Sequence, residues 1–397
     1  MAILVPLGFR LAGVHAGIKR NPQKHDMTLV VSDVPSVAAG VYTQNLVFAA
    51  PVGLNRGRTP GEAIRCVVIN SGNANACTGS RGDRDAARMA ELAARACGAQ
   101  PHQALVLSTG VIGEFLPMEK IERGIQAAAG QLGRDEQSLV GAARGMMTTD
   151  TRHKLAGRSF SLAGRQVEVT GMAKGAAMIG PRMATMLGLL LTDAALEPAV
   201  AQEALVRAVD ESFNCISVDG HMSTNDTVLL LANGAAGTSP LAGAELAMFQ
   251  GMLADICREL AHAIPADGEG ATHLVTIDVT GCATRAAAHW IAKSVAESPL
   301  VKTAIAGGDP NWGRIVSAAG YAGVPFDPAG VRLEINGVVL YHDGSPAAFD
   351  AAAVSQSIKD NRDVSIVLAF SEGDAGIRFW TTDLTADYVR LNADYRT

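Results

Sequence analysis

The stretch from Lys174 to Asp193 constrains this chain most, because its two halves have opposite character. Residues 174–184 are small, contain two glycines and are broken by Pro181, so they can continue neither a helix nor a central strand. Residues 186–191 form an apolar run that is typical of a buried strand. Thr185 stands between the two halves. The alternative is a structural threonine that packs its methyl group at a strand start, and these residues alone favour that alternative.

Length and composition favour a large α/β protein. The 397 residues are 48% hydrophobic, which is enough to bury the cores of two or three domains. Only 18% of them are charged and 42 are glycine, which indicates a compact α/β enzyme with many tight turns. The net charge of −6 comes without a basic run, so we expect no nucleic-acid partner.

The chain carries no signal that predicts export or membrane insertion. Its first residues are apolar, but they lack a basic segment and are interrupted at Pro6. No apolar window is long enough to cross a bilayer. The cysteines are scattered and form no Cys-x-x-Cys pair, so we expect reduced core residues and a cytoplasmic protein. They are Cys66, Cys77, Cys97, Cys215, Cys257 and Cys282.

Strands and helices alternate along the chain. Strands are predicted at 27–32, 64–70, 104–108, 186–191, 227–232 and 273–279, with a hairpin over 159–172. Helices are predicted at 83–98, 118–132, 139–147, 198–214 and 240–264. The last third has its own order, with a helix at 284–305, a short helix after the turn 307–314, and strands at 331–335, 365–370 and 376–381. We therefore expect a main catalytic domain over 1–280 and a smaller C-terminal α/β domain over 281–397.

Two loops could carry chemistry at strand ends. The segment 71–76 is small and polar, and it either presents amide groups above the strand end or forms a tight turn with left-handed Asn residues. Thr109-Gly110 offers a hydroxyl beside an unhindered backbone N–H, as an oxyanion hole requires. Such an exit is also common turn chemistry, so it indicates little alone.

A third polar stretch gathers Asp219, His221 and Asp226. A metal site is one interpretation, but there is no second His and the spacing matches no familiar zinc or iron pattern. A hydrogen-bonded loop is therefore favoured, and we expect no metal site.

The usual catalytic motifs are missing from this sequence. It has no Gly-x-Gly-x-x-Gly after a strand, no P-loop, no Gly-x-Ser-x-Gly and no His-Glu-x-x-His. Cleavage of the Ala184–Thr185 bond would supply another activated group, since Thr185 would then carry both a hydroxyl and a free α-amine. An α-amine has a pKa of roughly 7.7–8.0, so it can act as general base.

The sequence also resembles the ornithine acetyltransferase (glutamate N-acetyltransferase) family over nearly its whole length. One motif alone would be weak evidence, whereas so many in order are specific. They are Gly8-Phe9, Val68–Ala76, Ser108–Gly113, Met147–Asp150, Gly171–Gly175 with Pro181, Met183–Leu187, Asp267–Thr272, Gly308–Arg314 and Tyr388–Thr397.

The resemblance implies a fold and an activity. The expected fold is a layered α-β-β-α core like that of self-processing aminopeptidases, with a smaller C-terminal domain whose tail returns to the active site. The precursor would cut itself into an α chain (1–184) and a β chain (185–397) that stay together, in an α2β2 or larger assembly. Thr185 would take the acetyl group from N2-acetylornithine and pass it to glutamate in a ping-pong cycle of arginine biosynthesis.

The resemblance also implies the site residues. Thr109 and Gly110 would form the oxyanion hole, and Thr185 would be the nucleophile. Substrate would be bound by Thr148, Lys174, Thr185, Glu269, Asn392 and Thr397. No cofactor is expected. Some members of the family also accept acetyl-CoA as a donor, whereas others only take the acetyl group from acetylornithine. No motif in this sequence separates these two kinds of member.

The segment before Thr185 departs from the family pattern in two places. Ala176 and Ala177 occupy positions where the family has Ser and Gly or similar residues, and Arg182 replaces a small polar residue. Two other functions stay open at this point: a self-processed N-terminal-threonine aminopeptidase or amidohydrolase, and an unprocessed binding protein. The charged side chains of Lys174 and Glu269, suited to an amino-acid acceptor, favour acetyl transfer over hydrolysis.

Overall fold

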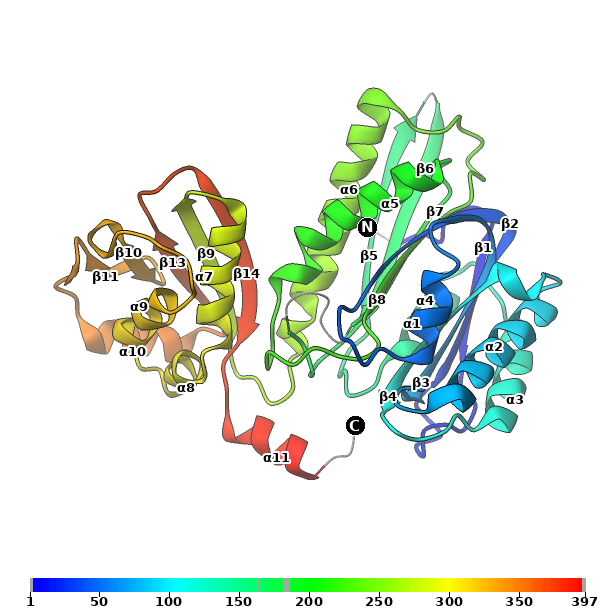
Figure 1. Cartoon of the computed structure of the whole chain (residues 1–397), viewed down its shortest axis with the longest axis horizontal. Helices are drawn as coiled ribbons and strands as arrows, with labels where there is room; N and C mark the ends of the chain where they lie inside the picture. The colour runs from blue at the N-terminus through cyan, green and yellow to red at the C-terminus, as the bar shows by residue number, and fades with distance from the viewer. Residues whose placement is uncertain (1–2, 163, 181–185, 395–397) are drawn as a thin grey trace.

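The computed structural model describes residues 3–162, 164–180 and 186–394, and these residues form two β-sheets that lie in separate lobes (Figure 1). The larger sheet contains β1 Phe9–Val14, β2 Met27–Tyr42, β3 Gly61–Asn73, β4 Ala104–Val111, β5 Lys154–Leu162, β6 Arg165–Lys174, β7 Leu187–Thr192 and β8 Thr227–Ala232. The smaller sheet contains β9 Leu274–Cys282, β10 Arg332–Ile335, β11 Val338–His342, β12 Ser345–Pro346, β13 Asp363–Ala369 and β14 Ala375–Thr382. The helices are α1 Ala50–Arg56, α2 Gly79–Ala96, α3 Met118–Ala129, α4 Glu136–Met146, α5 Pro198–Asp210, α6 Gly243–Ala263, α7 Arg285–Glu297, α8 Pro299–Gly307, α9 Trp312–Gly320, α10 Ala351–Asp360 and α11 Ala386–Asp394.

The long strand β2 organises the larger sheet, whose order is β4-β3-β2-β8-β7-β6-β5. Its first half pairs with β1 and β3, and its second half pairs with β8. Register shifts between Val31 and Ala38 mark the place where the pairing changes. The sheet therefore has two arms, one with β1, β3 and β4 and one with β5 to β8.

Helices cover both arms and also fill the space between them. α2 and α3 pack on the outer face of the β3–β4 arm, and α5 and α6 pack on the outer face of the other arm. α4 lies inside, where its Leu139, Ala142 and Met146 join a core with residues of β1 to β4 and β6 to β8. This arrangement confirms the predicted layered α/β core.

Strands from both sides of the predicted cleavage bond lie next to each other in this sheet. β6 ends at Lys174, whose partner in the antiparallel register is Leu187, the first residue of β7. β7 in turn runs parallel to β8. The small, Pro-containing segment before Thr185 thus connects two neighbouring strands, as its composition predicts. Pro181 to Thr185 themselves lie outside the described residues.

The smaller sheet has the order β12-β11-β10-β13-β9-β14 and is covered by α7 to α10 over its own hydrophobic core. β9 begins at Leu274, so this sheet includes residues on the N-terminal side of the boundary expected at 280/281; the boundary stays a prediction. After β14 the chain leaves the small lobe, and α11 lies near the larger one (Figure 1).

Several element predictions need correction. The single helix expected over 284–305 is two helices, because the Ser298 side chain accepts the N–H of Val301 and Pro299 opens a new helix. α2 begins four residues before Asp83, the expected cap. β1, β11, β12, α1, α10 and α11 were not predicted, since they are short or have weak periodicity.

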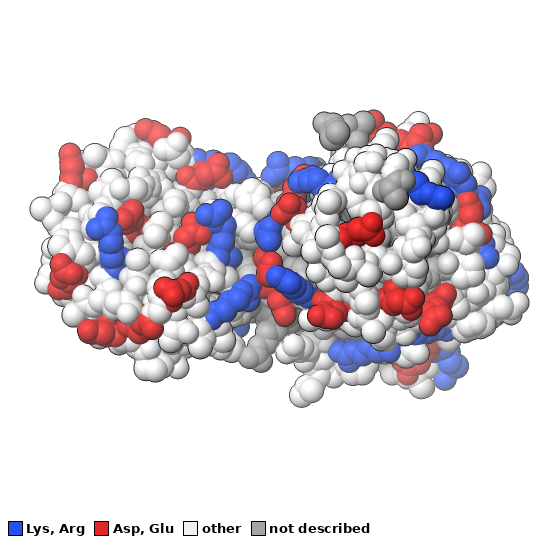
Figure 2. All heavy atoms as spheres, turned by 90° about the horizontal axis from the view of Figure 1, so that it is seen from above, with Lys and Arg blue, Asp and Glu red and all other residues white. Residues whose placement is uncertain are grey.

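Charges of both signs are mixed on the surface that Figure 2 shows, and the cysteines differ in their burial. Figure 2 shows basic and acidic side chains intermixed over one face, without a large patch of one sign. Cys66, Cys215, Cys257 and Cys282 are buried as expected, whereas Cys77 is exposed and Cys97 half-buried, so the core expectation is wrong for these two. Among the described residues, no helix combines the length and apolarity that a membrane span needs.

Candidate functional site

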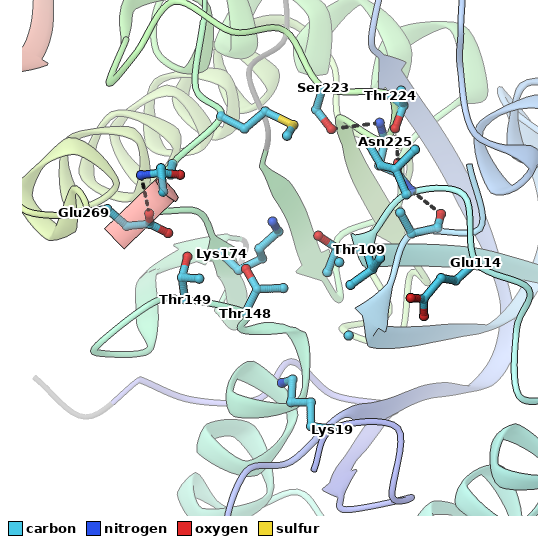
Figure 3. A pocket seen from close by; sticks show the side chains of 18 of the residues that line it. Lys19, Thr109, Glu114, Thr148, Thr149, Lys174, Ser223, Thr224, Asn225 and Glu269 are labelled. Atoms are coloured by element: carbon cyan, nitrogen blue, oxygen red, sulfur yellow. Dashed lines mark hydrogen bonds between the residues drawn. The ribbon is translucent and has the colours of Figure 1, made fainter. Parts of the chain in front are cut away.

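A pocket of about 840 Å³ opens beside the ends of β3, β4 and β6 (Figure 3). Its wall brings together side chains and backbone from both halves of the chain and from α11. The predicted site residues that line it are Thr109, Gly110, Thr148, Lys174, Glu269 and Asn392. Ala184, Thr185 and Thr397 lie outside the described residues. The structure therefore brings every described member of the predicted set into one cavity, and their roles stay predictions.

The Thr109-Gly110 pair sits at a bulge between β3 and β4. Gly110 pairs with Gly72 and has a φ of 132°, a conformation that L side chains rarely adopt. A Cβ atom on Gly110 would lie 2.3 Å from the carbonyl carbon of Gly72. Only glycine fits here, so the backbone at the pocket wall depends on this contact.

The asparagine-rich loop after β3 supports this wall. The side chain of Asn70 accepts a hydrogen bond from Ser108 and donates to the backbone of Asn73, and Asn75 has a left-handed φ of 48°. Gly72 and Ala74 of this loop line the pocket. The tight-turn alternative therefore describes the left-handed Asn75, whose side-chain amide donates to Gly82 O, better than a direct role above the strand end.

Asn225 was not singled out from the sequence, yet it holds the same wall. Its Nδ2 atom donates to the carbonyl oxygens of Ala74 (2.7 Å) and Ser108 (2.8 Å), and it is buried. The residue joins the segment before β8 to the loop that follows β3 and to β4 itself. No sequence signal marks it, because its partners lie 117 and 151 residues away.

Lys174 is the last residue of β6 and is 2% exposed. Burial lowers the pKa of its ammonium, while the carboxylates of Asp150, Asp226 and Glu269 act in the opposite direction. A carboxylate ligand in the pocket would add to this compensation. The residue is thus suited to bind an amino-acid carboxylate.

Asp150 holds the backbone of two separate pocket segments, at Thr148 and just after Lys174. Its Oδ1 atom accepts the N–H of Gly175 (2.7 Å), and its Oδ2 atom accepts the N–H of Thr148 (3.0 Å). Burial alone would raise the pKa of this carboxyl, but the cations of Lys154 and Lys174 and the bound N–H of Gly175 lower it. Asp150 therefore stays ionised and fixes Thr148 at the pocket wall.

Glu269 connects the pocket to the tail helix. The Nδ2 atom of Asn392 donates to Glu269 Oε2 at 3.1 Å, and Glu269 N donates to Ala176 O at 2.9 Å. Glu269 Oε1 is buried and has no hydrogen-bond partner among the described residues. α11 packs so closely on Gly270 that a Cβ there would lie 2.4 Å from Tyr388 N. The C-terminal helix thus lines the pocket, and the return of the tail to an active site stays a prediction.

Carboxylates hold both described ends of the segment that contains the predicted cleavage bond. Asp219 accepts the N–H groups of Met178 (2.7 Å) and Ile179 (2.8 Å). Asp226 is fully buried, its Oδ1 atom accepts the N–H of Met186 at 3.1 Å, and burial raises its pKa well above the usual range. The favoured interpretation of the 219–226 stretch as a hydrogen-bonded loop is therefore confirmed. The described residues contain no group of three or more His, Cys, Asp or Glu side chains placed to hold a metal ion.

The departures from the family pattern fall partly inside the described chain. Ala177 lines the pocket, and Ala176 is buried with its carbonyl bound by Glu269 N. Arg182 lies outside the described residues. Lys19, Asp219 and Tyr388 also line the pocket and were not assigned to it from the sequence.

Several known proteins that are similar to this chain share one family name. The sequence profile described as the ArgJ family matches residues 10–397. The chain is 47% identical over 397 residues to the arginine biosynthesis bifunctional protein ArgJ of Rhodopirellula baltica, covering 99% of this chain and 97% of that protein. It is 47% identical over 398 residues to the protein of the same name from Symbiobacterium thermophilum, covering 100% and 98%. A crystal structure of the ArgJ protein from Bacillus halodurans matches with 38% identity and a TM-score of 0.51, over 52% of this chain and 98% of that chain.

Proposed function

Because the chain belongs to the ArgJ family, we propose that it transfers an acetyl group from N2-acetyl-L-ornithine to L-glutamate after cutting itself between Ala184 and Thr185. As a member of this family, the chain is an acetyltransferase of arginine biosynthesis. One observation carries the finer proposal: the described residues expected to bind substrate and oxyanion all line a single pocket.

Self-cleavage begins when the Thr185 hydroxyl attacks the Ala184 carbonyl. The peptide C–N bond then breaks, the acyl group passes to the hydroxyl as an ester, and water hydrolyses this ester to leave Thr185 with a free α-amine. The two chains stay together because β2 and β6 of the α chain pair with β8 and β7 of the β chain. Separating them would break the middle of one sheet.

The first half of the cycle acylates Thr185. Its α-amine takes the hydroxyl proton as the oxygen attacks the acetyl carbonyl of N2-acetylornithine. The Thr109 hydroxyl and the Gly110 N–H stabilise the oxyanion. The bond between the acetyl carbon and the ornithine nitrogen breaks, the proton passes to that nitrogen, and ornithine leaves. Lys174 binds the substrate carboxylate, and Glu269 binds the side-chain ammonium.

The second half runs through the same groups in the opposite order. The α-amine of glutamate attacks the acetyl ester, and its proton passes through the Thr185 amine back to the threonine oxygen as the ester bond breaks. N-acetylglutamate leaves and Thr185 is restored. A hydrolase would use water in place of glutamate; the cationic Lys174 in the pocket wall favours an amino acid as acceptor, because it can bind the α-carboxylate.

Three further properties belong to the same proposal. We propose acetyl-CoA as a second acetyl donor, which the word "bifunctional" in the names of the relatives supports. We also propose an α2β2 or larger assembly and a cytoplasmic location. Initial-rate assays with acetyl-CoA and glutamate, and light scattering of the purified protein, test the first two.

Intact-mass measurement of the purified protein tests the central proposal. We expect two chains that meet at 184/185, and an acetyl adduct on the β chain after addition of N-acetylornithine that glutamate removes. A single uncut chain would refute self-cleavage. A cut chain without an adduct would refute the acetyl-enzyme, and a Thr185→Ala protein that still splits would refute the nucleophile.

A further inference from the structure

We propose that Lys19 binds the side-chain carboxylate of the acceptor amino acid and thereby makes the enzyme prefer glutamate. This inference rests on the proposed function, because it concerns the second half of that cycle. Lys19 lies on the loop between β1 and β2, far in sequence from the predicted site residues, and lines the same cavity (Figure 3).

Lys19 lies between two parts of the site that the reaction uses. Its Nζ atom donates to the carbonyl oxygen of Met147 at 2.5 Å, and the next residue is Thr148. On its other side it packs on Gly72: a Cβ built on Gly72 would lie 3.3 Å from Lys19 Cγ. Gly72 is the residue that contacts Gly110 of the proposed oxyanion hole. The ammonium is therefore placed at the wall where substrate must bind.

Hydrogen bonds from both its backbone and its side chain hold Lys19 in position. Its Nζ atom also donates to His25 O at 2.7 Å, and its backbone N–H donates to Asp26 Oδ2 at 2.9 Å. An ammonium has three hydrogens, and two are used by these carbonyls. Among the described residues the third has no hydrogen-bond acceptor. One donor of a held ammonium thus remains for a ligand.

The charge of Lys19 is only partly compensated. Asp26 is buried, and its two oxygens accept the N–H groups of Ala16 and Lys19. None of the ion pairs found within the described chain includes Lys19. Burial and the cations of Lys24 and Lys174 lower its pKa to about 8, against the opposing effect of Asp26 and Asp150. A carboxylate at this point would gain a charge-assisted hydrogen bond.

The chemistry of the two substrates requires such a group. N2-acetylornithine carries a side-chain ammonium, whereas glutamate carries a side-chain carboxylate, and both must present the α-position to Thr185. Glu269 suits the first and repels the second. Among the described residues, the other Lys and Arg side chains that line the pocket are Lys174, assigned to the α-carboxylate, and Arg20 and Lys24, which are exposed. Of the cations in the described part of the chain, Lys19 is the half-buried one left for the second carboxylate.

Comparison of two acceptors on one acetyl-enzyme tests the inference. With N-acetylornithine as donor, labelled ornithine as acceptor reports exchange that needs no second carboxylate, and glutamate reports the full reaction. For Lys19→Met we expect kcat/KM for glutamate to fall about 10- to 100-fold, the range of a charge-assisted hydrogen bond, with exchange changed less than about twofold. Glutamine has the same size as glutamate without the charge, so the Lys19→Met substitution should lower kcat/KM for glutamine as acceptor only a little.

Lys120→Met is the matched control. Lys120 is also half-buried and donates from Nζ to a carbonyl of the same loop, Gly17 O at 2.5 Å, but it does not line the pocket. We expect both acceptor activities of this variant to stay within about twofold of the wild type. If Lys19→Met does not complete self-cleavage, Lys19→Gln keeps a donor for the two carbonyls and is measured in the same way.

The outcomes separate this inference from the proposed function. Equal losses for glutamate and ornithine in the Lys19 variant, or no loss for either, would overturn the role of Lys19 while acetyl transfer stands. A wild-type enzyme that neither forms the acetyl adduct nor exchanges ornithine would refute the proposed function itself.

Discussion

The hydroxyl of Tyr388 donates a 3.1 Å hydrogen bond to Asp219, although 169 residues separate the two in the chain. The same carboxylate accepts the N–H groups of Met178 and Ile179, just before the proposed cleavage bond. One half-buried side of the pocket thus joins the tail helix α11 to the segment before the proposed cleavage bond. This contact makes Asp219 a positioning residue whose effect can be measured.

We expect Asp219→Asn to slow self-cleavage by about tenfold or more, because an amide presents only one accepting oxygen to these backbone donors and loses the charge assistance. The time course of splitting on a denaturing gel measures this. Tyr388→Phe removes only the contact with α11 and should split at the wild-type rate. Slow splitting of the Phe variant alone, with normal splitting of the Asn variant, would contradict the assignment.

Gly110→Ala should lower kcat by about 100-fold or more, the loss seen when one oxyanion donor is removed. The added Cβ would lie 2.3 Å from the backbone of Gly72 in a conformation unfavourable for alanine, so the bulge must shift. Gly113→Ala is the control, since Gly113 also has a positive φ, 84°, but a Cβ atom added there would meet no other atom within 4 Å. Steady-state kinetics of the two variants check this, and similar losses in both would argue against a local effect at the oxyanion hole.

Lys154→Met should destabilise the protein by about 3–5 kcal/mol, since it leaves two buried carboxylates without their cation. Lys154 Nζ lies 2.7 Å from both Asp150 Oδ1 and Asp267 Oδ2, and its side chain is 1% exposed. The exposed pair Arg158–Glu259 is the comparison, for which Arg158→Met should cost less than about 1 kcal/mol. Urea unfolding measures both free energies; equal costs would show that burial of the first pair does not matter.

The preference for glutamate over ornithine should fall as pH rises through about 8. Lys19 is charged below this pKa and neutral above it, and the anion-binding contribution is lost on deprotonation. The charged groups that act on it are Asp26, Lys24, Asp150 and Lys174. In the ratio of kcat/KM for the two acceptors the titration of the shared nucleophile cancels, and the same ratio measured for Lys19→Met removes the titration of the acceptor amines. A ratio that stays constant from pH 7 to about 9 would count against Lys19 as the acceptor site.

Much of the local structure around the site could be predicted from the sequence. β8 was expected at its observed bounds, and β6 ends at Lys174 where the small residues begin. These features depend on side-chain alternation, apolar runs and chain breakers, which act over a few neighbouring residues. The motifs that carried the family resemblance placed Thr109, Glu269 and the tail in one site for a different reason, through likeness to other proteins.

The sequence by itself therefore determined the positions of the longer strands and helices, the small and Pro-containing character of the segment before Thr185, and the chemical types available for acetyl transfer. Only the tertiary structure decided that Lys19, Asp219, Asn225 and Tyr388 share the pocket. Their contacts span up to 169 residues, and a long-range hydrogen bond leaves no periodic trace in the chain around it. Folding of the chain brings these side chains into one pocket, where their charges and hydrogen bonds act together.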